Sequence, residues 1–196
     1  MILKKSLLIF VPLLSMLSGY GCWNHMESYN YSCKRYNFSS SHILITESTR
    51  ICDNGMLLLG SIAPFQSSST SSFYDCPYSS VMVTWLVTEK NSTEEKRYKE
   101  LLSINLPKEF TAYDGAAIIF CFDNNGRAWV AYEYYYGSSD EDAKNSYMRR
   151  ISRKRKTVLG DGTNFNINDY SKYKQSNPRG TLEDFLRMQD ATDAIY

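Results

Sequence analysis

Cys22 is the residue best placed for covalent chemistry, because it ends an apolar leader with the sequence MILKKSLLIFVPLLSMLSGYGC. Lys4 and Lys5 give this leader a positive start. The apolar run that follows is about a dozen residues long, whereas a membrane-spanning helix needs roughly 20. A cysteine after a small residue at the end of such a leader is typical of bacterial lipoproteins. We therefore expect a signal peptide over residues 1–21 and lipidation of Cys22.

The end of the leader also fits ordinary cleavage. Gly21 and Cys22 resemble a lipobox, but Gly19 and Tyr20 stand where that motif usually has Leu and a small residue. Gly19 and Gly21 are also the small residues that a general signal peptidase accepts, which would leave Cys22 as a thiol. A buried core helix is disfavoured, because the composition changes sharply at Trp23.

The other cysteines favour the lipid-acceptor interpretation. The chain has five cysteines, so lipidation of Cys22 leaves an even set of four. In an exported protein such a set predicts two disulfides, with three possible connectivities. We expect Cys33–Cys52 and Cys76–Cys121, each stabilising the fold by about 2–4 kcal/mol. A zinc site is not expected, because there is no Cys-x-x-Cys and the chain has two histidines in all.

Catalytic constellations are poorly represented. The two histidines, His25 and His42, fall in a tether and at a strand start, and no Gly-x-Ser-x-Gly elbow occurs. Glu133 stands alone among tyrosines, where a carboxylate can serve glycoside hydrolysis, but a solvent-facing position or a cross-strand partner for Arg127 is favoured. Residues 161–166 (DGTNFN) only loosely suggest a calcium loop, since alternate acidic ligands and a terminal Glu are missing. We expect no enzyme activity, no cofactor and no metal.

Two groups of residues are candidates for binding a partner. The first is the basic run Arg149–Lys156, which has six cations in eight positions and suits an acidic protein partner or anionic headgroups. The second is a set of tyrosines, whose rigid rings with polar tips are favoured at interfaces. The competing interpretations are a solvated strand edge and a packed sheet face. The candidate residues are Tyr132, Tyr134, Tyr136, Arg149, Arg150, Arg153, Lys154, Arg155 and Lys156.

Charge and composition limit the function classes. Both basic residues of the leader are lost with it, so the remaining chain carries one more acidic than basic residue. A balance this close to zero argues against nucleic-acid binding by bulk charge. Tyr is over-used, at 16 residues, which favours strands. The length suits one domain with a real core.

Strand patterns dominate the middle of the chain. Residues 42–47 and 56–62 are expected to form a hairpin around the turn 52–55 (CDNG), and residues 66–72 (QSSSTSS) a mobile loop. Alternation predicts a strand over 81–89, then a charged helical turn or hairpin loop over 91–100 and a strand over 101–106. The clearest hairpin is Ala116–Tyr136, with a turn at 123–126 and a continuous apolar first strand typical of a central position.

The C-terminal part is expected to contain little helix. Residues 138–142 can begin a short helix, and residues 159–175 are Gly-, Asn- and Tyr-rich and indicate a loop. Thr181–Asp184 resembles a capping box that opens a final helix through about Asp190. The expected fold is mainly β, a single antiparallel sandwich-like or bent-sheet domain with a short C-terminal helix. Its expected boundaries are 1–21 signal peptide, 22–40 lipidated tether and 41–196 domain.

The layout resembles a known group of proteins. A short leader ending in Gly21-Cys22, a Tyr-, Asn- and Ser-rich domain and paired extra cysteines resemble the small enterobacterial lipoproteins proposed as type VI secretion immunity proteins. The resemblance implies a domain on the periplasmic side of the outer membrane that binds and blocks a secreted toxin; a soluble periplasmic or secreted form is the alternative. It transfers no binding residue beyond the anchor. The competing expectations are a structural or assembly lipoprotein of the envelope or a pilus, and a carboxylate-based hydrolase.

Overall fold

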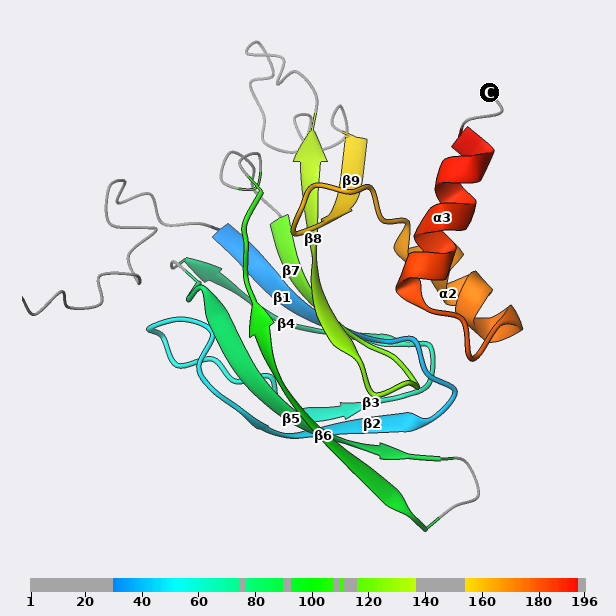
Figure 1. Ribbon diagram of the computed structural model, residues 1–196. Helices are drawn as coiled ribbons and strands as arrows, with labels where there is room; N and C mark the ends of the chain where they lie inside the picture. The colour runs from blue at the N-terminus through cyan, green and yellow to red at the C-terminus, as the bar shows by residue number, and fades with distance from the viewer. Residues whose placement is uncertain are drawn as a thin grey trace, which may run out of the picture.

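The computed structural model describes residues 30–74, 77–89, 93–107, 110, 116–136 and 154–193. Figure 1 shows two β-sheets facing one another, with two helices against the outer side of one sheet. The fold is thus mainly β and sandwich-like, as the sequence predicts. No helix in the described ranges is both long and apolar enough to cross a bilayer.

Sheet A has five strands in the order β4-β1-β7-β8-β9. Its middle strand, β7, is the apolar run AAIIFCF, and every one of its residues is buried. All pairs in sheet A are antiparallel except β1 with β7, which is parallel. The strands are β1 Asn30–Asn37, β4 Ser67–Tyr74, β7 Ala116–Phe122, β8 Ala128–Tyr136 and β9 Lys154–Leu159.

Sheet B has four antiparallel strands in the order β3-β2-β5-β6. β5 alternates as predicted, because Val81, Val83, Trp85 and Val87 all turn to the core. The turn at 52–55 is confirmed by a hydrogen bond from Gly55 N to Cys52 O of 3.1 Å. The strands are β2 His42–Ser48, β3 Gly60–Ile62, β5 Ser80–Thr88 and β6 Glu95–Ser103.

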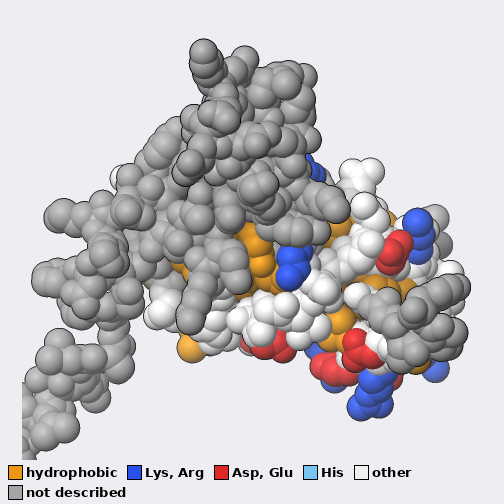
Figure 2. Space-filling model, turned by 90° about the horizontal axis from the view of Figure 1, so that it is seen from above, with side chains coloured by type: hydrophobic (Ala, Val, Ile, Leu, Met, Phe, Trp, Pro, Cys, Tyr) orange, Lys and Arg blue, Asp and Glu red, His pale blue; other side chains and the backbone are white. Residues whose placement is uncertain are grey.

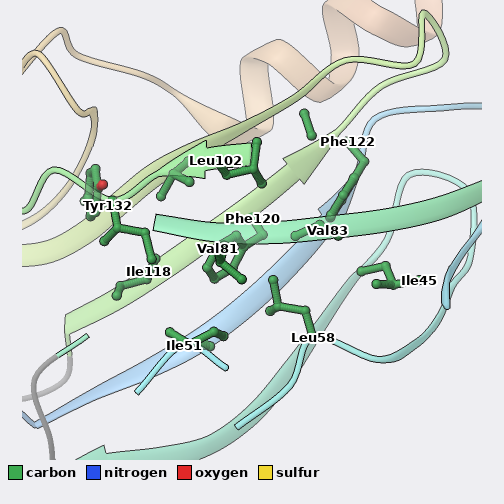
Figure 3. Close-up of a cluster of buried hydrophobic side chains, with 14 of the residues drawn as sticks. Ile45, Ile51, Leu58, Val81, Val83, Leu102, Ile118, Phe120, Phe122 and Tyr132 are labelled. Atoms are coloured by element: carbon green, nitrogen blue, oxygen red, sulfur yellow. The ribbon is translucent and has the colours of Figure 1, made fainter. Parts of the chain in front are cut away.

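The main core fills the space between the two sheets. Side chains of both sheets interdigitate there, as Figure 3 shows for Val81 and Val83 of sheet B and Phe120 and Phe122 of sheet A. The Trp85 ring lies 5.3 Å from the Phe122 ring in a near-perpendicular arrangement, which aromatic rings favour. This layer accounts for the alternation of apolar residues along β5 and β8.

A second core lies between the outer face of sheet A and the helices α2 (Ile167–Ser176) and α3 (Leu182–Asp193). Phe38 is its centre: its ring lies 4.7 Å from that of Tyr170 on α2 and 5.7 Å from that of Trp129 on β8. Phe185 of α3 packs on Tyr170 at 5.1 Å. The helices therefore bury the face of sheet A that would otherwise expose β7.

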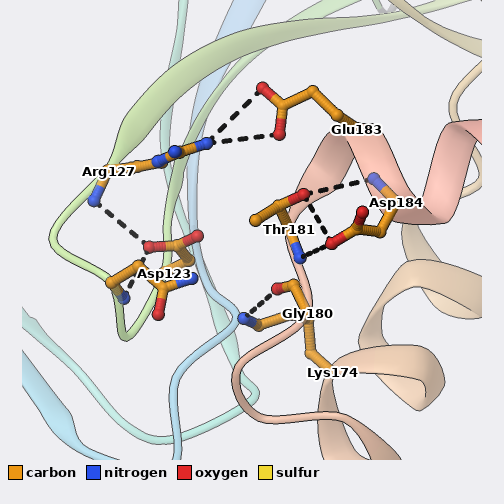
Figure 4. Close-up of polar contacts among 8 residues, drawn as sticks. Asp123, Arg127, Lys174, Gly180, Thr181, Glu183 and Asp184 are labelled. Carbon is orange, nitrogen blue, oxygen red and sulfur yellow. Dashed lines mark hydrogen bonds and ion pairs between the residues drawn. The ribbon is translucent and has the colours of Figure 1, made fainter.

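Polar contacts tie α2 to the α2–α3 connection and join α3 to the β7–β8 turn (Figure 4). Lys174, fully buried, donates to the carbonyls of Pro178 and Gly180 at 2.9 and 2.8 Å. Arg127 in the turn bonds Glu183 on α3 at 3.2 Å. The cross-strand arginine predicted for Glu133 is therefore Arg155 of β9 and not Arg127. Thr181 and Asp184 form the predicted cap of α3.

Several predicted elements were wrong. Residues 67–74 form an edge strand rather than a loop, because their backbone groups pair with β1. Residues 95–100 extend β6, and residues 167–176 form α2 instead of a loop. The tether predicted over residues 22–40 is too long, since residues 30–37 are the strand β1. The signal peptide, Cys22, His25 and the helix start at 138–142 lie outside the described residues.

Candidate binding cleft

A cleft of about 660 Å³ crosses the outer face of sheet A beside the start of α2. Lys34 and Tyr36 of β1, Glu133 of β8, and Arg155 and Lys156 of β9 contribute to its lining. Ser67 of β4 lies at the other edge strand, so the cleft spans the whole sheet. Its size falls within the roughly 300–1,000 Å³ of small-molecule sites.

Glu133 is the charged centre of the cleft. It faces outward with Trp129 and Ala131, because successive residues of β8 alternate between the two faces of sheet A. Glu133 is only 7% exposed as a residue. Its Oε1 lies 2.6 Å from Lys34 Nζ, and its Oε2 lies 3.7 Å from Arg155 Nη1. A buried carboxylate is tolerated when it is paired in this way.

The loop before α2 forms one wall of the cleft. Phe165, 2% exposed, anchors this loop in the second core, and its N–H donates to Thr157 O at 2.9 Å. Asn166 caps α2 by accepting from Asn168 N and Asp169 N at 3.1 and 3.2 Å. The first turn of α2 lines the cleft, so the positive end of the helix dipole lies there.

The described lining carries a surplus of positive charge. Lys34 and Arg155 place cations on this outer face, and Glu133 is the one acidic residue of the described lining; Lys156 pairs with the inward-facing Tyr134, so its side chain lies on the other face of β9. In the described part of the face that Figure 2 shows, acidic and basic side chains lie close to one another. Since the overall charge of the chain is near zero, the local charge of the cleft is what can select an anionic group.

The structure places only some of the predicted partner-binding residues in the cleft. Arg155 and Lys156 line the cleft. Tyr132 and Tyr134 do not, because they are 0% and 3% exposed in the core between the sheets, so they offer no surface to a partner. Burial raises the pKa of Tyr132 to about 12, and its oxygen accepts from Asn105 N at 2.7 Å. The described part of the structure does not include Arg149, Arg150 and Arg153, or the side chains of Tyr136 and Lys154.

No disulfide joins the described cysteines. Cys33, Cys52 and Cys121 are all buried, and each keeps its thiol. The predicted Cys33–Cys52 bond is therefore absent from the structure, although the two are near enough to interact: burial first, and the charge of Cys52 second, raise the pKa of Cys33 to about 12. Because Cys121 keeps its thiol, the predicted Cys76–Cys121 bond is also absent from the structure, although Cys76 itself lies outside the described residues.

Hydrolytic and metal chemistry find little support in the described residues. His42 is exposed on β2, in sheet B. No group of three or more His, Cys, Asp or Glu side chains in the described ranges is placed to hold a metal. Asp161 instead accepts from Thr163 N at 2.9 Å, which lowers its pKa and closes a turn.

Lys34 and the wall residues of the cleft were not among the predicted site residues. One feature of the sequence could have indicated Lys34. Tyr31 and Cys33 share one face of an alternating segment, so Lys34 lies on the other face. Its meeting with Glu133 depends on the β1–β7 pairing, which the sequence does not indicate. A scan against protein-family models and searches of curated proteins and of solved structures find no match to this chain.

Proposed function

We propose that this protein is an exported binding protein, tethered to the periplasmic side of the outer membrane through Cys22, that binds and blocks a secreted antibacterial toxin. The observation that carries the binding role is the cationic cleft across sheet A. The layout of leader, cysteine and small β domain supports the tether and the kind of partner. Anchoring would concentrate the protein where a toxin arrives, which is an effective-concentration gain.

The cleft suits binding better than catalysis. Glycoside hydrolysis by two carboxylates needs a second acid within roughly 5–10 Å of the first. Glu133 is the one carboxylate among the described lining residues, and both its oxygens face cations. These contacts stabilise the carboxylate as an ionic anchor of the sheet.

Affinity capture tests the proposal. The full chain with a C-terminal tag is captured from cell envelopes of a strain that carries the neighbouring genes, and co-purifying proteins are identified by mass spectrometry. A soluble toxin should co-purify, and co-expression of the chain should protect cells from it. If only envelope assembly components are captured, the toxin-blocking role is wrong.

The tether has a separate test. Labelled palmitate should enter the wild type and should not enter Cys22→Ser. Label in both, or in neither, would refute the anchor without bearing on the cleft.

One observation favours a role in assembly as the second candidate. β4 ends sheet A, and its sequence SSSTSSFY has no charged residue or proline. Exposed edges are usually protected by such residues, as the charged edge strand β6 (EKRYKELLS) illustrates. An unprotected edge can accept a strand from an assembly partner. Substitution of the exposed Ser69 of β4 by Lys should abolish such an assembly.

A further inference from the structure

We propose that the cleft recognises a carboxylate-bearing extended segment of the protein partner, and that Glu133 competes with that segment for the same cations. This inference rests on the proposed binding function and names the chemistry of its ligand.

The ion pairs of Glu133 show how the cleft binds a carboxylate. Lys34 and Arg155 contact different oxygens of Glu133, at 2.6 and 3.7 Å. Lys34 is 27% exposed and closely bound, whereas the Arg155 side chain is 57% exposed and at the longer distance. Arginine binds carboxylates through a planar fork of donors. An incoming carboxylate can therefore bind Arg155 while Glu133 stays on Lys34.

Further positive charge lies on the same side. The first turn of α2 lines the cleft on the same face as Arg155. The N–H groups of Asn168 and Asp169 are taken by the cap Asn166, so what this end of α2 offers an anion is the positive end of its dipole. Lys34 and Arg155 carry two positive charges against the one negative charge of Glu133, so one more carboxylate can be accommodated without leaving the cleft negative.

The length of the cleft favours a peptide over a headgroup. It spans from Ser67 on β4 to Arg155 on β9, the two edges of a five-stranded sheet. Four inter-strand steps of about 4.8 Å give roughly 19 Å, which matches about six residues of extended chain. The polar side chains of Thr157, Asn164 and Asn168 along the wall can bond a peptide backbone. A phosphate headgroup would fill only one end.

The test compares three variants of the full chain. The probe is a synthetic octapeptide of alternating Glu and Ser, with a Gln-and-Ser octapeptide as its neutral match, and calorimetry at low salt measures the affinity. Arg155→Gln should weaken binding of the acidic peptide by about fivefold or more, and Glu133→Gln should tighten it by about fivefold, from one charge at about 4 Å in a solvated site. Lys99→Gln, which removes an exposed cation from sheet B, should change it less than about twofold.

Arg155→Gln and Glu133→Gln should change the affinity for the acidic peptide in opposite directions, which makes the result decisive. Glu133→Gln keeps the shape of the side chain and an acceptor for Lys34, and partial unfolding cannot produce a gain of affinity. Equal binding of the two peptides, or no effect of Arg155→Gln and Glu133→Gln, would overturn the inference. So would binding to phosphatidylglycerol vesicles that depends on Arg155 when the peptide fails to bind.

Failure of the two proposals can be told apart. If all variants capture the envelope partner equally, the toxin-binding proposal stands and the cleft is not its site. If the acidic peptide behaves as expected and no toxin is captured, the ligand chemistry stands and the toxin is not the source of the segment.

Discussion

Lys34 Nζ lies 2.6 Å from Glu133 Oε1, although 99 positions separate the two residues in the chain. Lys34 is on β1 and Glu133 on β8, with β7 running between them. Lys34 pairs with Ile119 in the β1–β7 register and Glu133 pairs with Ala117 in the β7–β8 register, so the contact crosses β7 diagonally. The contact forms only when the parallel β1–β7 pair and the β7–β8 hairpin are both in register, so it also disfavours slipped pairings.

Removal of Lys34 should therefore destabilise the fold through Glu133. Lys34→Met leaves Glu133, which is 7% exposed as a residue, with Arg155 as its remaining ion-pair partner among the described residues, which we expect to cost about 1–2 kcal/mol in urea unfolding. The double variant Lys34→Met, Glu133→Gln should recover most of this loss. Lys96→Met is the matched control, because its pair with Glu89 is exposed on both sides, and it should leave the free energy of unfolding close to the wild-type value. A single variant as stable as this control would contradict the buried-charge argument.

Acid should weaken the start of α3. Thr181 N and Oγ1 donate to Asp184 Oδ2 at 3.0 and 2.8 Å, and these bonds hold the pKa of Asp184 below its usual 3.8. Because the folded-state pKa is the lower one, the stabilisation is present above the unfolded-state pKa and is lost as the pH falls through the folded-state value. Asp184→Asn should therefore unfold at lower urea near neutral pH and lose less on going from about pH 5 to about pH 2.

The control for this titration is Asp190→Asn, which changes an exposed carboxylate on the same helix. It should keep the wild-type dependence on pH. If both variants flatten the pH profile equally, the dependence comes from the charge of the helix in general and the cap is not its cause.

Elements with strong local signals could be predicted from the sequence. The hairpin Ala116–Tyr136 was predictable because a continuous apolar run, an Asn-Gly turn and an alternating return strand all agree. The cap Thr181–Asp184 was predictable because its bonds involve neighbours in the chain. In both cases the residues that decide the structure lie within one element or turn.

Other elements depend on partners that are distant in the chain. The serines of β4 have no intrinsic preference for strand, and pairing with β1 decides their conformation. α2 has a weak apolar stripe of Ile167, Tyr170 and Tyr173, together with the cap Asn166; this spacing was present in the sequence and was outweighed by the Gly and Asn content. The same reason explains why only part of the site was predicted. Arg155 and Lys156 stand in an evident basic run, whereas Lys34 and the loop before α2 join the site only through tertiary packing.

The buried thiols should be inert in the folded protein. Cys33 and Cys52 are both 0% exposed, and burial raises the pKa of Cys33 to about 12, so little thiolate forms near pH 8. Alkylation of the native protein should spare both residues, and urea should expose them together with global unfolding. Peptide mapping without reductant checks the bonding: a Cys33–Cys52 pair that stays linked would show the bond that the sequence predicts and the structure lacks. Labelling of Cys33 well before unfolding would contradict its place in the core.

The β7–β8 turn offers a test of packing between the sheets. Gly126 has a φ of +75°, and a Cβ on it would overlap the ring of Tyr98 from β6. Gly162 has a similar φ of +89°, but a Cβ there would meet nothing within 4 Å. Gly162→Ala should therefore cost about 1 kcal/mol, the strain of a left-handed alanine. Gly126→Ala should cost about 2–4 kcal/mol, because overpacking adds to the same strain.

A double-mutant cycle separates the two contributions. Tyr98 also stacks on Trp85, with ring centroids 5.6 Å apart, so its own loss will destabilise the core. In the background of Tyr98→Ala, the further cost of Gly126→Ala should fall to that of Gly162→Ala, because the ring that the new Cβ would overlap is gone. If Gly126→Ala costs the same in both backgrounds, backbone strain alone explains it, and the turn does not pack against Tyr98.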